Sequence, residues 1–92
     1  MAHSLVSTLY NTRNIVVDLL FTDLDLAFTM LETARISEEQ ATKERNIANA
    51  AKAHKDVAFT AARMEMSPGD RERLQNRLSD LATLLAALTH PV

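Results

Sequence analysis

Cysteine and tryptophan are absent from this 92-residue chain, which also has only one glycine and two prolines. Without cysteine the chain can form neither a disulfide framework nor a thiolate metal site, which fits a reducing cytoplasm. With so little glycine and proline it has few residues for tight turns, so a β-sheet protein is not expected. These absences favour a single all-α domain spanning residues 1–92.

A strong charge bias and a long apolar run are also missing. The net charge of −2 gives no basic surface, so nucleic-acid binding is disfavoured. No apolar stretch approaches the roughly 18–20 residues that a membrane helix needs. The residues before Arg13 contain no lysine or arginine, unlike the start of a secretion signal. We therefore expect a cytoplasmic protein that binds neither membranes nor nucleic acid.

The only glycine and the only internal proline stand side by side in "SPGD", residues 67–70. Ser67 can accept a hydrogen bond from a free backbone N–H at a helix start, and Pro68 suits the first helical position. Asp70 then places negative charge in the first turn, where the helix dipole favours it. The motif predicts a helix over 67–89. Its apolar stripe has alternating steps of four and three residues: Leu74, Leu78, Leu81, Leu85 and Leu88.

A second start signal, "ISEEQA", precedes the alanine-rich middle of the chain. Ser37 and Gln40 have the spacing of a capping box, and Ile36 with Ala41 can form a hydrophobic staple. Nothing breaks a helix from there to about Met64, so we predict a helix over 37–64. If both serines cap helices, Ser37→Ala and Ser67→Ala should each lower stability by about 0.5–2 kcal/mol.

The first third of the chain shows one continuous helical phase, which predicts a helix over 4–35. A narrow polar stripe runs along it: Asp18, Thr22, Asp25, Thr29 and Glu32. Short links make neighbouring helices antiparallel. The sequence therefore predicts an up-down-up three-helix bundle.

His54 is the one histidine near the middle of an apolar helix face. The segment "AKAHKDVA" loosely resembles the phosphoacceptor helix of histidine phosphotransfer domains, but Val57 and Ala58 replace the lysine and glycine that usually follow the histidine. A histidine held in the core by a hydrogen bond is the simpler interpretation. We expect a mostly buried His54 that a phosphodonor does not label.

No residue pattern supports a metal site or a catalytic centre. A carboxylate–histidine site in a bundle would need glutamate at Ala51, three residues before His54. Asp18, Asp25 and Glu32 follow the spacing of a solvated stripe. Serine nucleophile motifs and phosphate-binding glycine loops are missing as well. We therefore expect no catalytic residue, cofactor or metal, and a protein that is not an enzyme.

The pattern "DLDLAFTMLETAR…NIANAAKAHKDVAFTAARMEMSPGDRERLQNRLSDLATLL" resembles a group of small, uncharacterised bacterial all-helical proteins. They share an early Asp-Leu helix, an alanine-rich middle helix and a leucine-rich last helix. Residues 44–75 are also similar to a single tetratricopeptide helical hairpin, without the Trp, Gly and Tyr positions of that repeat. This resemblance implies a helical surface that binds protein.

The predicted first and second helices carry apolar arcs wider than the stripe of somewhat over 100° that a bundle core requires. Such surplus surface indicates an interaction site. The candidates lie on two edges of the first helix: Leu19, Leu26 and Met30 on one, and Tyr10, Phe21 and Phe28 on the other. Periodicity does not give the handedness of the bundle and so does not choose the edge.

The sequence thus favours a non-catalytic protein-interaction module that self-associates through its first two helices. One alternative is a phosphotransfer-like or small-ligand module centred on His54. Another is a small acidic inhibitor or adaptor of a larger protein.

Overall fold

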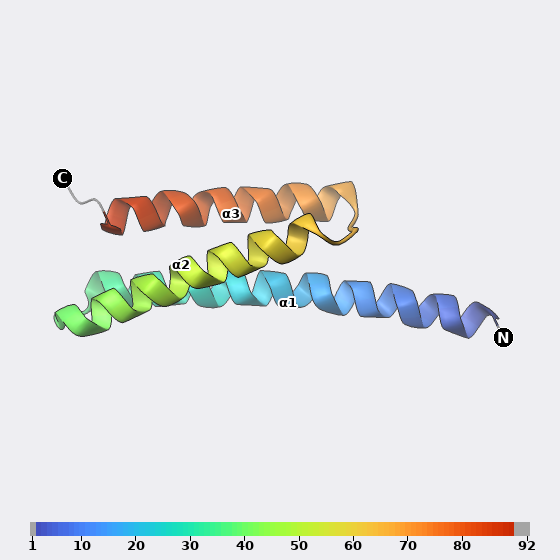
Figure 1. The fold of residues 1–92 in the computed structure, drawn as a ribbon, viewed down its shortest axis with the longest axis horizontal. Coiled ribbons are helices and arrows are strands. Elements are labelled where there is room, and N and C mark those ends of the chain that lie inside the picture. Colours follow the sequence, from blue (N-terminus) through green and yellow to red (C-terminus); the bar gives the residue numbers. More distant parts are fainter. Residues whose placement is uncertain (1, 90–92) are drawn as a thin grey trace.

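Three helices make up the secondary structure of the described residues: α1 (Ala2–Ile36), α2 (Gln40–Ala62) and α3 (Pro68–Thr89). The structure is a computed structural model that describes the backbone of residues 2–89 and the side chains of residues 13–89. Consecutive helices run in opposite directions, and each packs against the other two (Figure 1). The predicted all-α, up-down-up three-helix bundle is confirmed.

The start of α3 follows the predicted cap. The backbone N–H of Asp70 donates to Ser67 Oγ at 3.1 Å, and the N–H of Arg71 donates to the Ser67 carbonyl at 3.0 Å. Pro68 is the first helical residue, where its missing N–H leaves no hydrogen bond unmade. Serine, proline and aspartate therefore act together to begin the helix where the sequence predicted.

The predicted start of α2 at Ser37 is wrong. The N-cap is Glu39, which makes no side-chain capping bond. The Ser37 N–H instead donates to the Thr33 carbonyl at 3.0 Å at the end of α1, and Ser37 Oγ accepts from the Glu39 N–H at 3.2 Å. The predicted staple is absent too, since Ile36 is 65 % exposed. A three-residue turn, 37–39, thus replaces the capping box.

The two serines now make a matched pair for a stability measurement. Ser67→Ala removes an N-cap hydrogen bond and should lower the free energy of unfolding by about 0.5–2 kcal/mol. Ser37→Ala removes only an exposed turn contact and should change it by less than about 0.5 kcal/mol. Urea unfolding followed by circular dichroism measures both. Equal losses for the two variants would contradict this assignment of caps.

α2 ends at Ala62, two residues before the predicted end. A side chain of the next helix donates hydrogen bonds to carbonyls at this end of α2. Arg71 donates from Nη2 to the Met64 carbonyl at 2.7 Å and from Nη1 to the Ala61 carbonyl at 3.3 Å. One guanidinium on the first turn of α3 therefore bonds one carbonyl in the last turn of α2 and one in the connection that follows it.

The core lies between the three helices and is built mainly from α1. Its buried members are aliphatic: Val17, Leu20, Leu24, Ala27, Leu31 and Ala34 from α1, Ala50, Val57 and Ala61 from α2, and Leu74 and Leu81 from α3. The small side chains of Ala50 and Ala61 are buried in this core. The outer alanines Ala48, Ala51 and Ala62 are exposed, so the predicted apolar arc of α2 is only partly buried.

α1 is much longer than its two partners. It has 35 residues, whereas α2 has 23 and α3 has 22. The α2–α3 turn meets α1 near Arg13 and Val17, and the backbone of residues 2–12 continues beyond the bundle in Figure 1. We call residues 2–12 the N-terminal extension.

Candidate interaction surface

An apolar row runs along α1 beside the core, on the side of the groove between α1 and α2. Ile15, Leu19 and Leu26 are 59 %, 55 % and 53 % exposed, and Met30 is half-buried at the end of the row. We call these four residues the α1 seam. Met30 also packs against the core, whereas Ile15, Leu19 and Leu26 are not part of the core and remain more than half exposed.

The other predicted edge of α1 is occupied within the bundle. Phe21 and Phe28 are half-buried and pack against the core. The guanidinium of Arg73 lies 5.6 Å from the ring centre of Phe21, and that of Arg77 lies 4.4 Å from the ring centre of Phe28. Both distances suit cation–π attraction, so α3 already covers this edge. Tyr10, the third residue predicted there, lies outside the described side chains.

The α1 seam borders a shallow groove of about 310 Å³ between α1 and α2. Leu26 and Met30 form its apolar wall, and the lining from α2 carries both charge signs. The groove is lined by Asp23, Leu26, Met30, Asn49, Lys52, Ala53 and Asp56. This face therefore combines exposed aliphatic groups with polar groups that can fix a partner's orientation.

Threonines interrupt the seam without leaving hydroxyls unpaired. Thr22 Oγ1 donates to the Asp18 carbonyl at 3.0 Å, and Thr29 Oγ1 donates to the Asp25 carbonyl at 3.1 Å. A threonine bonded to its own helix in this way can be covered by a partner without losing a hydrogen bond. The exposed face of α1 is thus less polar than its composition indicates.

His54 is partly buried where α2 packs on α3. Its Nε2 lies 3.0 Å from the carbonyl oxygen of Leu78, which can only accept, so the ring donates from Nε2. This is the interhelical hydrogen bond expected of a structural histidine. The geometry commits one ring nitrogen to the fold.

The acidic stripe of α1 lies in solvent, as the sequence predicted. Asp25 pairs with Arg77 of α3. Arg35 donates from Nε to Glu32 Oε2 at 3.0 Å, and this hydrogen bond lowers the pKa of Glu32 below its ordinary value. A carboxyl group whose pKa is lowered stays ionised and is poorly suited to act as a general acid near neutral pH.

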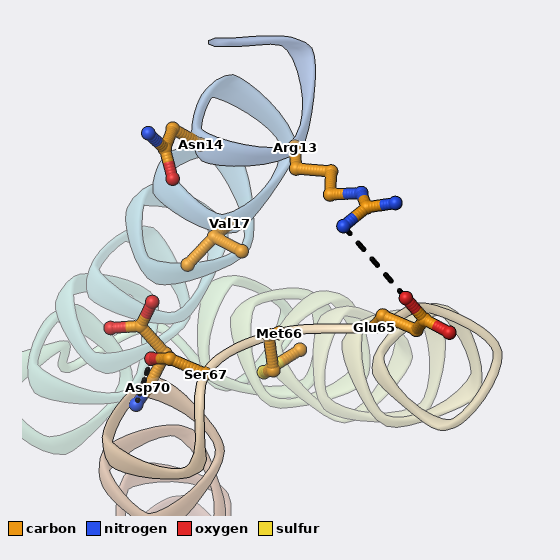
Figure 2. A pocket seen from close by; sticks show the side chains of 7 residues that line it. All are labelled: Arg13, Asn14, Val17, Glu65, Met66, Ser67 and Asp70. Carbon is orange, nitrogen blue, oxygen red and sulfur yellow. Dashed lines mark hydrogen bonds and ion pairs between the residues drawn. The ribbon is translucent and has the colours of Figure 1, made fainter. Parts of the chain in front are cut away.

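A second hollow, of about 250 Å³, lies where α1 passes the α2–α3 turn. Figure 2 shows Val17 at its base, with Arg13 and Asn14 from α1 and Asp70 from α3 around it. Arg13 and Glu65 form an ion pair of 3.8 Å across one side, and both side chains are largely exposed. The hollow is smaller than the roughly 300–1,000 Å³ of typical ligand sites.

Three exposed large apolar residues were not among the predicted contacts: Ile15, Ile36 and Phe59. Ile15 extends the seam by one turn, and the four-residue step to Leu19 was the available signal. Phe59 is 59 % exposed on α2, with the Arg63 guanidinium 3.5 Å from its ring centre. That stacking shields one face of Phe59, so its exposure does not by itself indicate a binding site.

No protein-family model, curated protein or solved structure compared with the chain matches it. Among the described residues, no helix is long and apolar enough to cross a membrane. The described part of the chain also has no group of histidine and carboxylate side chains that could hold a metal ion. The candidate site therefore rests on the surface geometry of α1 and α2.

Proposed function

We propose that this chain is a non-catalytic protein-interaction module that pairs with a second copy of itself. The contact surface is the face formed by α1 and α2 on the side away from α3. The exposure of Ile15, Leu19 and Leu26 beside the residues with which α1 fills the core carries this proposal. The lack of cysteine supports a cytoplasmic location.

The free energy forgone by leaving these apolar side chains in water supports an interaction role. Burial of a leucine or isoleucine side chain is worth about 1.5–3 kcal/mol relative to full exposure. Three such side chains lie in one row and are each more than half exposed, so a partner that covers them gains part of this burial free energy. Contiguous exposed apolar surface of this kind typically marks a binding site.

A phosphotransfer function has no observation in its favour. Nε2 of His54 is bonded to the Leu78 carbonyl, and the lysine usual after a phosphoacceptor histidine is replaced by Val57. An adaptor of a larger protein would use the same α1–α2 face. It differs from the proposal in the identity of the partner and in the oligomeric state of the pure protein.

Sedimentation equilibrium of the pure chain tests self-association. We expect a reversible monomer–dimer equilibrium with a dissociation constant on the order of micromolar, because only one face of a small bundle is available. A strict monomer up to about 300 µM, some hundredfold above that value, would rule out the second copy as partner. Such a result would favour the adaptor role.

A further inference from the structure

The α1 seam has a symmetric spacing. Its members are Ile15, Leu19, Leu26 and Met30, which are separated by steps of four, seven and four residues. Read from either end, the row presents the same spacing of aliphatic groups. An antiparallel copy of the helix therefore matches it, with Leu19 opposite Leu26 of the other copy and Ile15 opposite Met30.

We infer that two copies pair through antiparallel α1 helices about a two-fold axis that passes between the two α1 helices, level with Thr22 and Asp23. This inference rests on the proposed self-association and adds its geometry. A two-fold axis requires a self-complementary surface, because each residue meets the residue related to it by symmetry. The symmetric spacing of the seam meets that requirement. Binding to a partner of unrelated sequence would not require such symmetric spacing.

Two charges beside the seam are self-complementary, whereas Asp23, which lines the same groove, meets its own copy near the axis and opposes pairing. Lys52 and Asp56 line the groove next to Leu26 and lie one helical turn apart on α2. When a second copy runs in the opposite direction, each of these charges faces the opposite sign on the partner. Thr22, at the axis, has its hydroxyl bonded to the Asp18 carbonyl and can be covered at little cost.

The N-terminal extension takes part in this arrangement. With residue 19 opposite residue 26, residue 12 lies level with residue 33 of the other copy, and residue 9 with residue 36. The extension of each copy then runs alongside the end of α1 in the other, where Ile36 is exposed. The arrangement gives the backbone of residues 2–12, which passes beyond its own bundle, a neighbour in the second copy (Figure 1).

The contact area agrees with a modest dimer. The stretch from Ile15 to Met30 is roughly 24 Å long, and two adjacent helices are about 20 Å wide. One face therefore covers roughly 500 Å² per copy, or about 1,000 Å² in total, the lower limit for a specific interface.

Single cysteines test the geometry, because the chain contains none of its own. Thr22→Cys should form a disulfide-linked dimer under mild oxidation, since the two copies of this position meet at the axis. Leu19→Cys and Leu26→Cys should link poorly alone, because like positions lie roughly 10 Å apart along the helix. The double variant Leu19→Cys/Leu26→Cys should link efficiently. Non-reducing gels measure the linked fraction.

Ala86→Cys, on the exposed side of α3, is the matched control for random collision and should not link. Efficient linking of Leu19→Cys and Leu26→Cys as single variants would show parallel pairing and overturn the antiparallel geometry, while the proposed self-association would stand. A wild-type chain that sediments as a monomer would overturn both. Linking of Thr22→Cys and of the double variant, without the single variants, supports the inference.

Discussion

Leu24→Ala is expected to lower the free energy of unfolding by about 2–5 kcal/mol. Leu24 is fully buried in the middle of α1 and packs with residues of all three helices in one core cluster. Alanine would leave a cavity that rigid helices fill only partly. Because small domains have a total stability of about 5–15 kcal/mol, this loss could unfold a large fraction of the chain.

Leu26→Ala, two residues further along the same helix, is the control. Leu26 is 53 % exposed, so its loss should change monomer stability by less than about 0.5 kcal/mol. Urea unfolding below about 1 µM, where a weak dimer dissociates, measures both variants as monomers. A similar loss for the two leucines would mean that the bundle packs around a different face of α1.

The second large effect concerns association. Leu19→Glu should raise the dimer dissociation constant by more than about a hundredfold, because each dimer loses two buried leucines and gains two carboxylates in an apolar contact. Asp18 and Asp23 on the same helix add like-charge repulsion. Helicity and the monomer melting curve should stay unchanged, since Leu19 is exposed.

Ala86→Glu introduces the same charge on the exposed side of α3, away from the proposed contact, and should leave the dissociation constant unchanged. Sedimentation equilibrium compares the two variants with the wild type. If Leu19→Glu associates as tightly as the wild type, the α1 seam is not the contact surface. Equal weakening by both variants would point to net charge rather than to a specific face.

The sequence predicted the fold because helix signals are local. The four-and-three spacing of the leucines in α3 identified Leu74 and Leu81, which are the most deeply buried residues of that helix. Ser67 could be recognised as a cap because the residue after it is Pro68, whose ring holds its own φ angle near the helical value. Ser37 lacked such a neighbour, and its hydroxyl closed a shorter turn with Glu39 instead.

The choice between the two edges of α1 depended on long-range packing. Periodicity placed Phe21 and Leu19 on opposite edges but did not show which edge α3 would cover. The structure resolves this through Arg73 and Arg77, which lie over Phe21 and Phe28 and leave Leu19 exposed. These contacts join residues about fifty positions apart, so no local pattern could predict them.

The hydrogen bonds from Arg71 make the two connections of the bundle unequal. The side chain reaches from α3 to the carbonyls of Ala61 and Met64, so the length of the segment at 63–67 is set by the reach of one guanidinium. Residues inserted there would separate Arg71 from its acceptors, whereas the turn at 37–39 contains only exposed local hydrogen bonds. Changes in chain length during evolution should therefore be tolerated between α1 and α2 and selected against between α2 and α3.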